Sequence, residues 1–532
     1  MQSVRSLAVR VALFLLVAST TALAGEPKQG GILRMYHRDS PGSTSIHEGA
    51  SYSFNVPFMP VFNNLVIYNQ HIAQNSMDTI VPDLAENWAW SGDNKTLTFK
   101  LRHGVKWHDG KPFTSADVKC TFDMVMGKSQ QKLRQNPRKA WYEQVNDITT
   151  NGDFEVSFNL KRPQPSLLAL LASGYSPIYP CHVSPAEMRT HPIGTGPFKL
   201  AEFKANESIK LTRNPDYWKK GRPYLDGIEF TIIPNRSTAI LAFVAGKFDA
   251  TFPTEVSIPL MKDVKSQAPN AICAVEPSNV STNIIVNSSA PPFDNGDIRR
   301  AMALALDREA FISILFEGQA DIGGSMLPPP EGLWGMPREM LETIPGYGPD
   351  VNANREAARQ LMQKAGYGPD KHLAIKVSTR NIPIYRDPAV ILIDQLKSIY
   401  IDGELDVVET ANWFPKIARK DYMLGLNLTG NAVDDPDQSF YENYSCGSER
   451  NYTNYCNKDI EKLFDEQSQE TDISKRKRLV WEIDKKLQED VARPIIFHSR
   501  TGSCWQPYVK GMTVMSNSSY NGYRYEDVWL DK

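Results

Sequence analysis

The sequence of 532 residues has no long apolar run after residue 24. A membrane-spanning helix needs about 20 consecutive apolar residues, so we expect no segment beyond the N-terminus to cross a bilayer. The sequence also has no surplus of either charge, since 59 Lys and Arg stand against 61 Asp and Glu. Binding to nucleic acid or to an anionic membrane depends on a basic surplus, and we expect neither partner.

Motifs of the common enzyme classes are missing as well. There is no G-x-S-x-G, no H-E-x-x-H and no G-x-G-x-x-G after a strand, so nucleophile, zinc and dinucleotide sites are not indicated. Gly127-Lys128-Ser129 resembles the end of a phosphate loop, but Phe122 stands where that loop requires Gly. His103 and His108 lie in a turn-rich segment and are interpreted as structural polar residues. We therefore expect no enzyme activity, no cofactor and no metal site.

The N-terminus has the pattern of a secretory signal peptide. Arg5 and Arg10 precede a short apolar run from Val11 to Ala18, and a small-x-small cleavage site ends at Ala24. A buried N-terminal helix is the alternative interpretation. We expect cleavage near Ala24/Gly25 and export to the periplasm.

The segment from Ile80 to Val125 has the pattern of a compact module with a strand and a helix. After a Gly-Asp-Asn turn, apolar and polar residues alternate with the period of a half-buried strand. Thr114 or Ser115 is a candidate cap for the helix that follows. The apolar residues of the strand are Leu97, Phe99 and Leu101, and those of the helix are Val118, Phe122 and Val125. A second alternating run, Val156 to Leu160, is expected to pair with the first strand.

The residues of this module stand in a characteristic order. The string P-D-L-A-E-N-W (82–88) precedes the strand, and G-V-K-W-H-D-G-K-P-F-T-S-A-D-V (104–118) follows it. The string G-T-G-P-F (194–198) comes later in the chain. Together they closely resemble the family 5 extracellular solute-binding proteins, which are the peptide-binding receptors of bacterial ATP-binding cassette (ABC) importers. The resemblance covers essentially all of residues 30–515.

The resemblance implies an α/β periplasmic-binding-protein fold. In that fold two α/β lobes are joined by two crossing strands, and an extra lobe is inserted in the first. Division into lobes also suits the length, since 532 residues are too many for one core. The expected segments are a signal peptide (1–24), an N-terminal lobe (25–75, 193–275 and 500–532), an inserted lobe (76–192) and a C-terminal lobe (276–499).

The resemblance also implies a function without catalysis. A monomeric receptor would bind a small peptide or peptide-like solute between its lobes, close by hinge bending, and deliver the solute to an inner-membrane ABC permease. Two alternatives stay open. The same fold accommodates a non-peptide ligand, such as an opine, a sugar derivative, a metal chelate or an organic acid. A sensor or chaperone without a transport role is the other alternative.

Three predicted strands of the C-terminal lobe end in polar or aromatic residues. Arg380 follows the strand Leu373 to Val377, and Trp413 follows the strand Leu405 to Val408. The turn Thr429-Gly430-Asn431 follows a third strand, from residue 422 to 428. Ligands in open α/β sheets bind beyond the carboxyl ends of the strands, so we expect these residues near the ligand. Arg386 is a further candidate cation.

The dipeptide receptors of the family suggest a role for each position. The resemblance implies that Arg380 holds a ligand carboxylate and that Trp413 walls the side-chain pocket. In the third position this sequence departs from the family, because Asn431 stands where those receptors carry an Asp that takes the ligand ammonium. Asp434 is a possible substitute for that Asp. The alternatives are an ion pair within the protein for Arg380 or Arg386, and a core position for Trp413.

The N-terminal lobe is expected to complete the site. Ser51 and Tyr52 lie in a predicted polar loop after the strand Ile32 to Tyr36. The Tyr hydroxyl and the Ser backbone are suited to bind ligand amides.

Six cysteines in an exported chain suggest disulfides. Cys446 and Cys456 bracket a polar loop, and a similarly placed pair occurs in the dipeptide-binding branch of the family. Metal binding is not expected, because no C-x-x-C pair is present. In the architecture that the resemblance implies, Cys273 and Cys504 lie near the two lobe crossings, so we expect them to pair. We also expect Cys120 to pair with Cys181. The three expected bonds are therefore Cys446–Cys456, Cys273–Cys504 and Cys120–Cys181.

Overall fold

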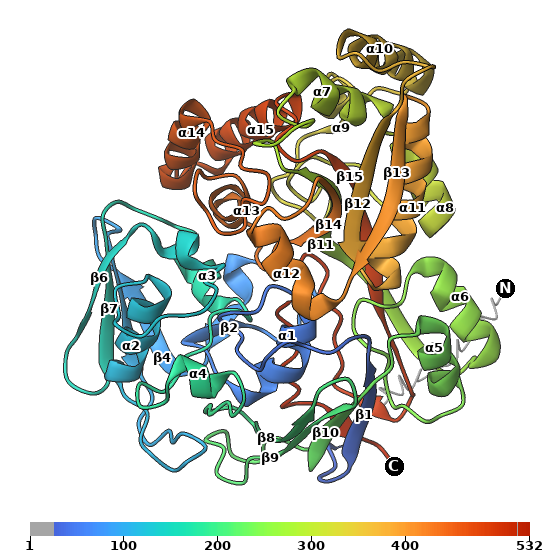
Figure 1. The fold of residues 1–532 in the computed structure, drawn as a ribbon. Coiled ribbons are helices and arrows are strands. Elements are labelled where there is room, and N and C mark those ends of the chain that lie inside the picture. Colours follow the sequence, from blue (N-terminus) through green and yellow to red (C-terminus); the bar gives the residue numbers. More distant parts are fainter. Residues whose placement is uncertain (1–25, 519) are drawn as a thin grey trace, which may run out of the picture.

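The computed structural model describes residues 26–518 and 520–532, so the predicted signal peptide lies outside the described residues. Three sheets of four or five strands organise the chain, and the helices pack around them (Figure 1). We propose that these sheets mark the three lobes expected from the sequence. Within the described residues, no helix combines the length and apolar character that crossing a membrane requires.

The N-terminal lobe is built on a four-stranded sheet. Its order is β1-β10-β9-β8, with β1 parallel to β10 and the other neighbours antiparallel. The strands are β1 (Ile32–His37), β8 (Phe198–Lys204), β9 (Ser208–Arg213) and β10 (Gly227–Ile232). The helices are α1 (Tyr52–Phe58), η1 (Met59–Val61), α5 (Arg236–Val244) and α6 (Ile258–Gln267). Two small sheets pair β2 (Val66–Tyr68) with β3 (Ile80–Pro82), and β16 (Val509–Lys510) with β17 (Trp529–Leu530); η2 (Met77–Thr79) precedes β3.

One sequence prediction is wrong here. Ser51 and Tyr52 were expected in a loop, but Ser51 is the N-cap residue of α1 and Tyr52 is its first residue. The segment has weak helix formers and an internal Pro57, so local propensity does not indicate a helix. Burial of nearly all of α1 shows that tertiary packing determines it.

The inserted lobe is an antiparallel sheet with the order β4-β5-β7-β6. Leu97 of β5 lies opposite Phe158 of β7, which confirms the predicted strand pairing. Thr114 caps α2 in a reciprocal arrangement with Asp117, so of the two predicted caps Thr114 is correct. The strands are β4 (Ala85–Trp90), β5 (Thr96–Leu101), β6 (Val145–Thr150) and β7 (Glu155–Leu160). The helices are α2 (Ser115–Val125), η3 (Lys139–Tyr142), α3 (Leu167–Ala172) and α4 (Pro185–Met188).

The C-terminal lobe has a mixed sheet with the order β13-β12-β14-β11-β15. β12 runs parallel to both β13 and β14, whereas β11 is antiparallel to β14 and β15. The strands are β11 (Ile272–Val286), β12 (Leu373–Arg380), β13 (Ile401–Val408), β14 (Leu424–Gly430) and β15 (Ile495–Trp505). The helices are α7 (Gly296–Ala305), α8 (Arg308–Phe316), α9 (Arg338–Leu341), α10 (Val351–Lys364), α11 (Pro383–Lys397), α12 (Thr410–Ala418), α13 (Pro436–Asn443), α14 (Lys458–Gln469) and α15 (Ile473–Glu489).

The long strands β11 and β15 connect the C-terminal and N-terminal lobes. At their far end, Trp505 bridges to Ala250, which itself bridges to Met35 of β1. Their pairing shifts register between Pro277 and Ser281. Interruptions of this kind bend a strand and redirect side chains next to functional sites, and this one lies where the lobes face each other.

The six cysteines form three disulfides. Cys120 of α2 is bonded to Cys181, which lies before α4. Cys273 and Cys504 lie opposite each other on β11 and β15, so their bond ties the two crossing strands together. The third bond, between Cys446 and Cys456, closes the loop after α13. These are the three pairs given in the sequence analysis.

Candidate ligand-binding site

The carboxyl ends of β12, β13 and β14 lie at one edge of the C-terminal sheet, because β12 is parallel to both neighbours. Arg380 is the last residue of β12, and Gly430 is the last residue of β14. Trp413 lies in α12, which follows β13. The edge therefore carries the predicted residues, and it meets the N-terminal lobe at Arg380.

Arg380 is fully buried and connects the two lobes. Its Nε donates to Thr410 Oγ1 at 2.8 Å within its own lobe. Its Nη2 donates to Ser53 Oγ at 2.8 Å and forms an ion pair with Asp39, both from the N-terminal lobe. In residues 26–518 and 520–532, Nη1 of Arg380 has no hydrogen-bond partner. A buried donor without a partner costs about 1–3 kcal/mol, so this nitrogen is a candidate ligand contact.

The Asp39 carboxylate is held ionised at this interface. Burial raises its pKa, but the positive charge of Arg380 and a hydrogen bond from Ser53 outweigh burial and leave the pKa well below its usual range. Thr410 also donates to the same carboxylate. The Asp39–Arg380 pair is thus neutral as a whole, and it holds the lobes together in this structure.

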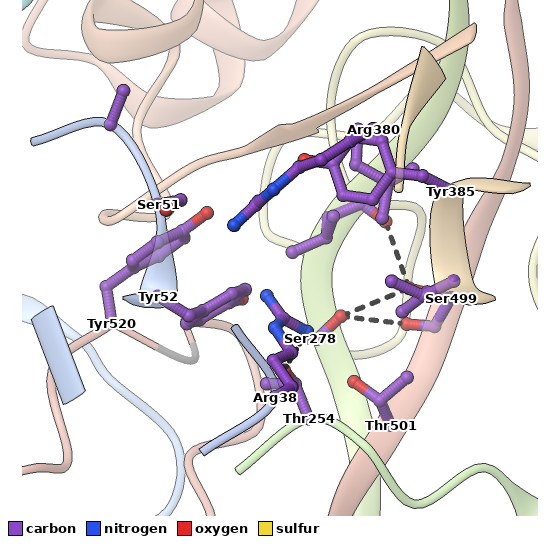
Figure 2. Close-up of a pocket in the computed structure, with 14 residues that line it drawn as sticks. Arg38, Ser51, Tyr52, Thr254, Ser278, Arg380, Tyr385, Ser499, Thr501 and Tyr520 are labelled. Atoms are coloured by element: carbon purple, nitrogen blue, oxygen red, sulfur yellow. Dashed lines mark hydrogen bonds between the residues drawn. The ribbon is translucent and has the colours of Figure 1, made fainter. Parts of the chain in front are cut away.

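A small cavity lies between the lobes beside this pair, and we call it the inner cavity. Its volume is about 20 Å³, which is room for about one water molecule. Arg38, Ser51 and Tyr52 line it from the N-terminal lobe, and Arg380 and Tyr385 from the C-terminal lobe (Figure 2). Ser278, Ser499 and Thr501 line it from the crossing strands β11 and β15.

Aromatic rings form one wall of the inner cavity. The ring of Tyr52 is stacked on Tyr520, with 4.1 Å between centroids and 5° between planes. Arg38 lies over the Tyr52 ring, 5.7 Å from its centroid. Gly430 makes room for this wall, because a Cβ at that position would overlap the Tyr520 hydroxyl. Gly430 therefore shapes the cavity without contributing a side chain to it.

Two larger cavities lie near the inner one. The first, which we call the outer cavity, has a volume of about 350 Å³ and shares Thr254, Ile384 and Thr501 with the inner cavity. This volume lies within the usual range for small-molecule sites. A third cavity, also of about 350 Å³, is lined by Arg386 and shares Arg236 with the outer cavity. Arg386 is half-buried and donates to Asn381 Oδ1 at 3.4 Å.

Trp413 is fully buried and does not line the inner cavity. Its ring belongs to a separate apolar cluster with Ile285, Phe414 and Ile417. Its Nε1 donates to Asn427 Oδ1 at 3.4 Å. In this structure Trp413 occupies the core position that the sequence analysis gave as the alternative.

Thr429 and Asn431 are buried and Asp434 is half-buried, and none of them lines the inner cavity. Thr429 Oγ1 accepts from Arg493 at 3.0 Å, and Asn431 Nδ2 donates to Asn279 Oδ1 at 3.4 Å. Asp434 accepts a hydrogen bond from the Leu333 amide at 3.0 Å, and burial raises its pKa to about 6. Of the nine predicted ligand residues, the structure brings Arg380, Ser51 and Tyr52 to the inner cavity.

Sequence reasoning missed Arg38, Tyr385 and Tyr520, which also line the cavity. The signal for Arg38 was available, because it directly follows β1 and the strand-end rule that selected Arg380 applies to it equally. Tyr520 had no such signal. It comes from the irregular C-terminal segment, which returns to the cavity only in the folded chain.

Comparison with known proteins places this geometry in a family. The family model described as "Bacterial extracellular solute-binding proteins, family 5 Middle" matches residues 79–451. The dipeptide-binding protein of Escherichia coli (strain K12) is 25% identical, in an alignment that covers 87% of this chain and 88% of that protein.

Solved structures share the fold. An ABC transporter-associated periplasmic binding protein, DppA from Helicobacter pylori in complex with peptide STSA, matches with a TM-score of 0.81 at 21% identity, over 95% of this chain and 99% of that one. AgaA from A. tumefaciens R10 in complex with agropinic acid matches with a TM-score of 0.80 at 22% identity, over 94% and 99%. Since the family model matches well over half of the chain and the lobes and crossing strands agree with this fold, the protein belongs to the family 5 bacterial extracellular solute-binding proteins.

Proposed function

We propose that the protein is a monomeric periplasmic receptor that captures a small peptide or peptide-like solute between its lobes and delivers it to an ABC-type permease. The curated relative from Escherichia coli is named as a dipeptide-binding protein, and the Helicobacter pylori structure is titled as ABC transporter-associated and peptide-bound. Both names support the ligand class and the transport role. The mature chain begins near Gly25 in this proposal.

The observation that carries the proposal is the buried Arg380 at the lobe interface. Arg380 lines the inner cavity, and one of its nitrogens has no partner within the described residues. A guanidinium has donors only, so the missing partner must be an acceptor. A carboxylate is the strongest such acceptor and forms a charge-assisted hydrogen bond.

The size of the inner cavity requires movement before a ligand binds. A volume of about 20 Å³ does not hold a dipeptide, so ligand entry requires the lobes to separate along the crossing strands β11 and β15. Re-closure around the solute would give the form that the permease receives. The outer cavity extends the space available to a longer ligand.

Native mass spectrometry of the purified protein tests this proposal directly. We expect co-purified peptides or peptide-like acids, one per chain, with the free protein at the mass of a monomer that starts near Gly25. After the cargo is removed by unfolding and refolding, matching synthetic ligands should stabilise the chain by about 2.7 kcal/mol at 100 times Kd. If no cargo co-purifies and no di- or tripeptide library member raises the melting temperature, peptide binding is refuted.

A further inference from the structure

A second buried arginine lines the inner cavity from the opposite lobe. Arg38 directly follows β1 and is 5% exposed. Its Nη1 forms an ion pair with Glu255 at 2.8 Å. In the part of the chain that the structure describes, its Nε has no hydrogen-bond partner. Figure 2 shows Arg38 and Arg380 entering the cavity from opposite sides, with their guanidinium groups turned toward each other.

The described lining of the inner cavity contains positively charged side chains but no negatively charged ones. Both arginines line the cavity, but no Asp or Glu does. The carboxylates nearest to them, Asp39 and Glu255, are already paired with Arg380 and Arg38. Each arginine retains one nitrogen without a partner among residues 26–518 and 520–532. Among the described residues, the buried side-chain atoms of these two ion pairs that lack a hydrogen-bond partner are therefore both donors.

These donors favour a ligand carboxylate and disfavour a ligand ammonium in the inner cavity. A carboxylate offers acceptors alone and fits two guanidinium donors. An ammonium offers donors alone, and no Asp or Glu of the described chain lines the inner cavity, so an ammonium buried there has no opposite charge beside it. Ser51 Oγ is also buried without a partner in the described residues; its hydroxyl can donate to a carboxylate, but it carries no charge to offset an ammonium.

We propose that Arg38 and Arg380 form a two-sided clamp for one carboxylate of the ligand, so that the receptor selects acids that carry no ammonium group. This inference rests on the proposed function and narrows its ligand class. The ligand is a carboxylate whose amino group is acylated or absent, such as an N-blocked dipeptide. Because the two arginines belong to different lobes, the carboxylate also joins the lobes and favours the closed form.

Three forms of one dipeptide mixture test the ligand class. The free dipeptides, their N-acetyl derivatives and their C-terminal amides are each incubated with the refolded, cargo-free protein and measured by native mass spectrometry and calorimetry. We expect the N-acetyl forms to bind at least about 10-fold more tightly than the free forms, and the amides not to bind. Free dipeptides that bind as tightly as, or more tightly than, the acetylated ones would refute the clamp's selectivity while leaving peptide binding intact.

A fourth probe set separates the two proposals further. It contains non-peptide monocarboxylates of similar size. If only these bind, the peptide proposal fails and the carboxylate clamp stands. If nothing in the four sets binds, both proposals fail.

Variants of Arg38 test its part in the clamp. Arg38→Gln alone leaves Glu255 buried without its partner, so the fold is protected by the double variant Arg38→Gln/Glu255→Gln, which removes both charges. We expect this double variant to melt near the wild type and to bind the N-acetyl dipeptides about 30-fold or more weakly. Arg338→Gln, at an exposed arginine paired with Glu342, is the matched control and should bind as the wild type does. Unchanged affinity in the folded double variant would remove Arg38 from the site.

Discussion

Removing Arg380 should open the protein as well as weaken ligand binding. In the structure its guanidinium is fully buried and pairs with Asp39 of the opposite lobe. Arg380→Ala therefore leaves an ionised carboxylate in the closed interface without its cation. Separation of the lobes relieves this penalty, because water then reaches Asp39. The expected response is a shift from the closed to the open form, with little change in the folding of each lobe.

The magnitude follows from the burial of the pair. Breaking a buried ion pair by removing one partner costs about 3–5 kcal/mol, and here that cost applies to the closed form. The closed-to-open ratio should then fall by about 160-fold to about 5,000-fold. Thr410 and Ser53 still donate to Asp39, which places the expected effect toward the lower end.

Small-angle X-ray scattering of the cargo-free protein measures this shift. Arg380→Ala should increase the radius of gyration relative to the wild type. Asp39→Asn/Arg380→Gln should return it toward the wild-type value, because no uncompensated charge is left. Wild-type scattering by Arg380→Ala, or equal opening by the single and double variants, would show that the charge of Asp39 does not control closure and would refute the reasoning.

Three further predictions concern single features of the chain. Asp434→Asn should raise the free energy of unfolding by up to about 3 kcal/mol at pH 8. The reason is that burial raises the pKa of Asp434 to about 6 in the folded protein, so the wild type loses stability as the pH rises from about 4 to about 6. Equal urea curves for both proteins at pH 4 and pH 8 would contradict this. Gly430→Ala should displace Tyr520 and reduce affinity for any identified ligand by calorimetry, while unchanged affinity would show that the aromatic wall tolerates a Cβ. The denatured, oxidised protein should show no free thiol, and peptide mapping should join Cys446 to Cys456; alkylation of both as free thiols would exclude that bond.

Much of the fold follows from patterns that are local in sequence. The strand with Leu97 and the helix capped by Thr114 form where alternation and capping predict them. Predicted caps are less secure when two polar residues compete. α7 is capped by Asn295 and not by the nearby Asp297, because the Asn295 side chain accepts from the Asp297 amide. Asp297 instead lies in the first turn, where a negative charge favours the helix.

The site shows where local patterns stop being sufficient. The sequence by itself determined that Arg380 lies at the carboxyl end of a strand in the C-terminal sheet, because strand ends can be read from residue periodicity. Only the tertiary structure decided that Asp39 neutralises this arginine and that Trp413 packs in a core cluster. The tertiary structure also brings Arg38 and Tyr520 to the cavity. The ion pair of Asp39 with Arg380 and the approach of Arg38 and Tyr520 to one cavity join residues hundreds of positions apart, and their energies depend on burial and on distances between lobes. No local pattern encodes those distances, because they arise when the crossing strands bring the lobes together.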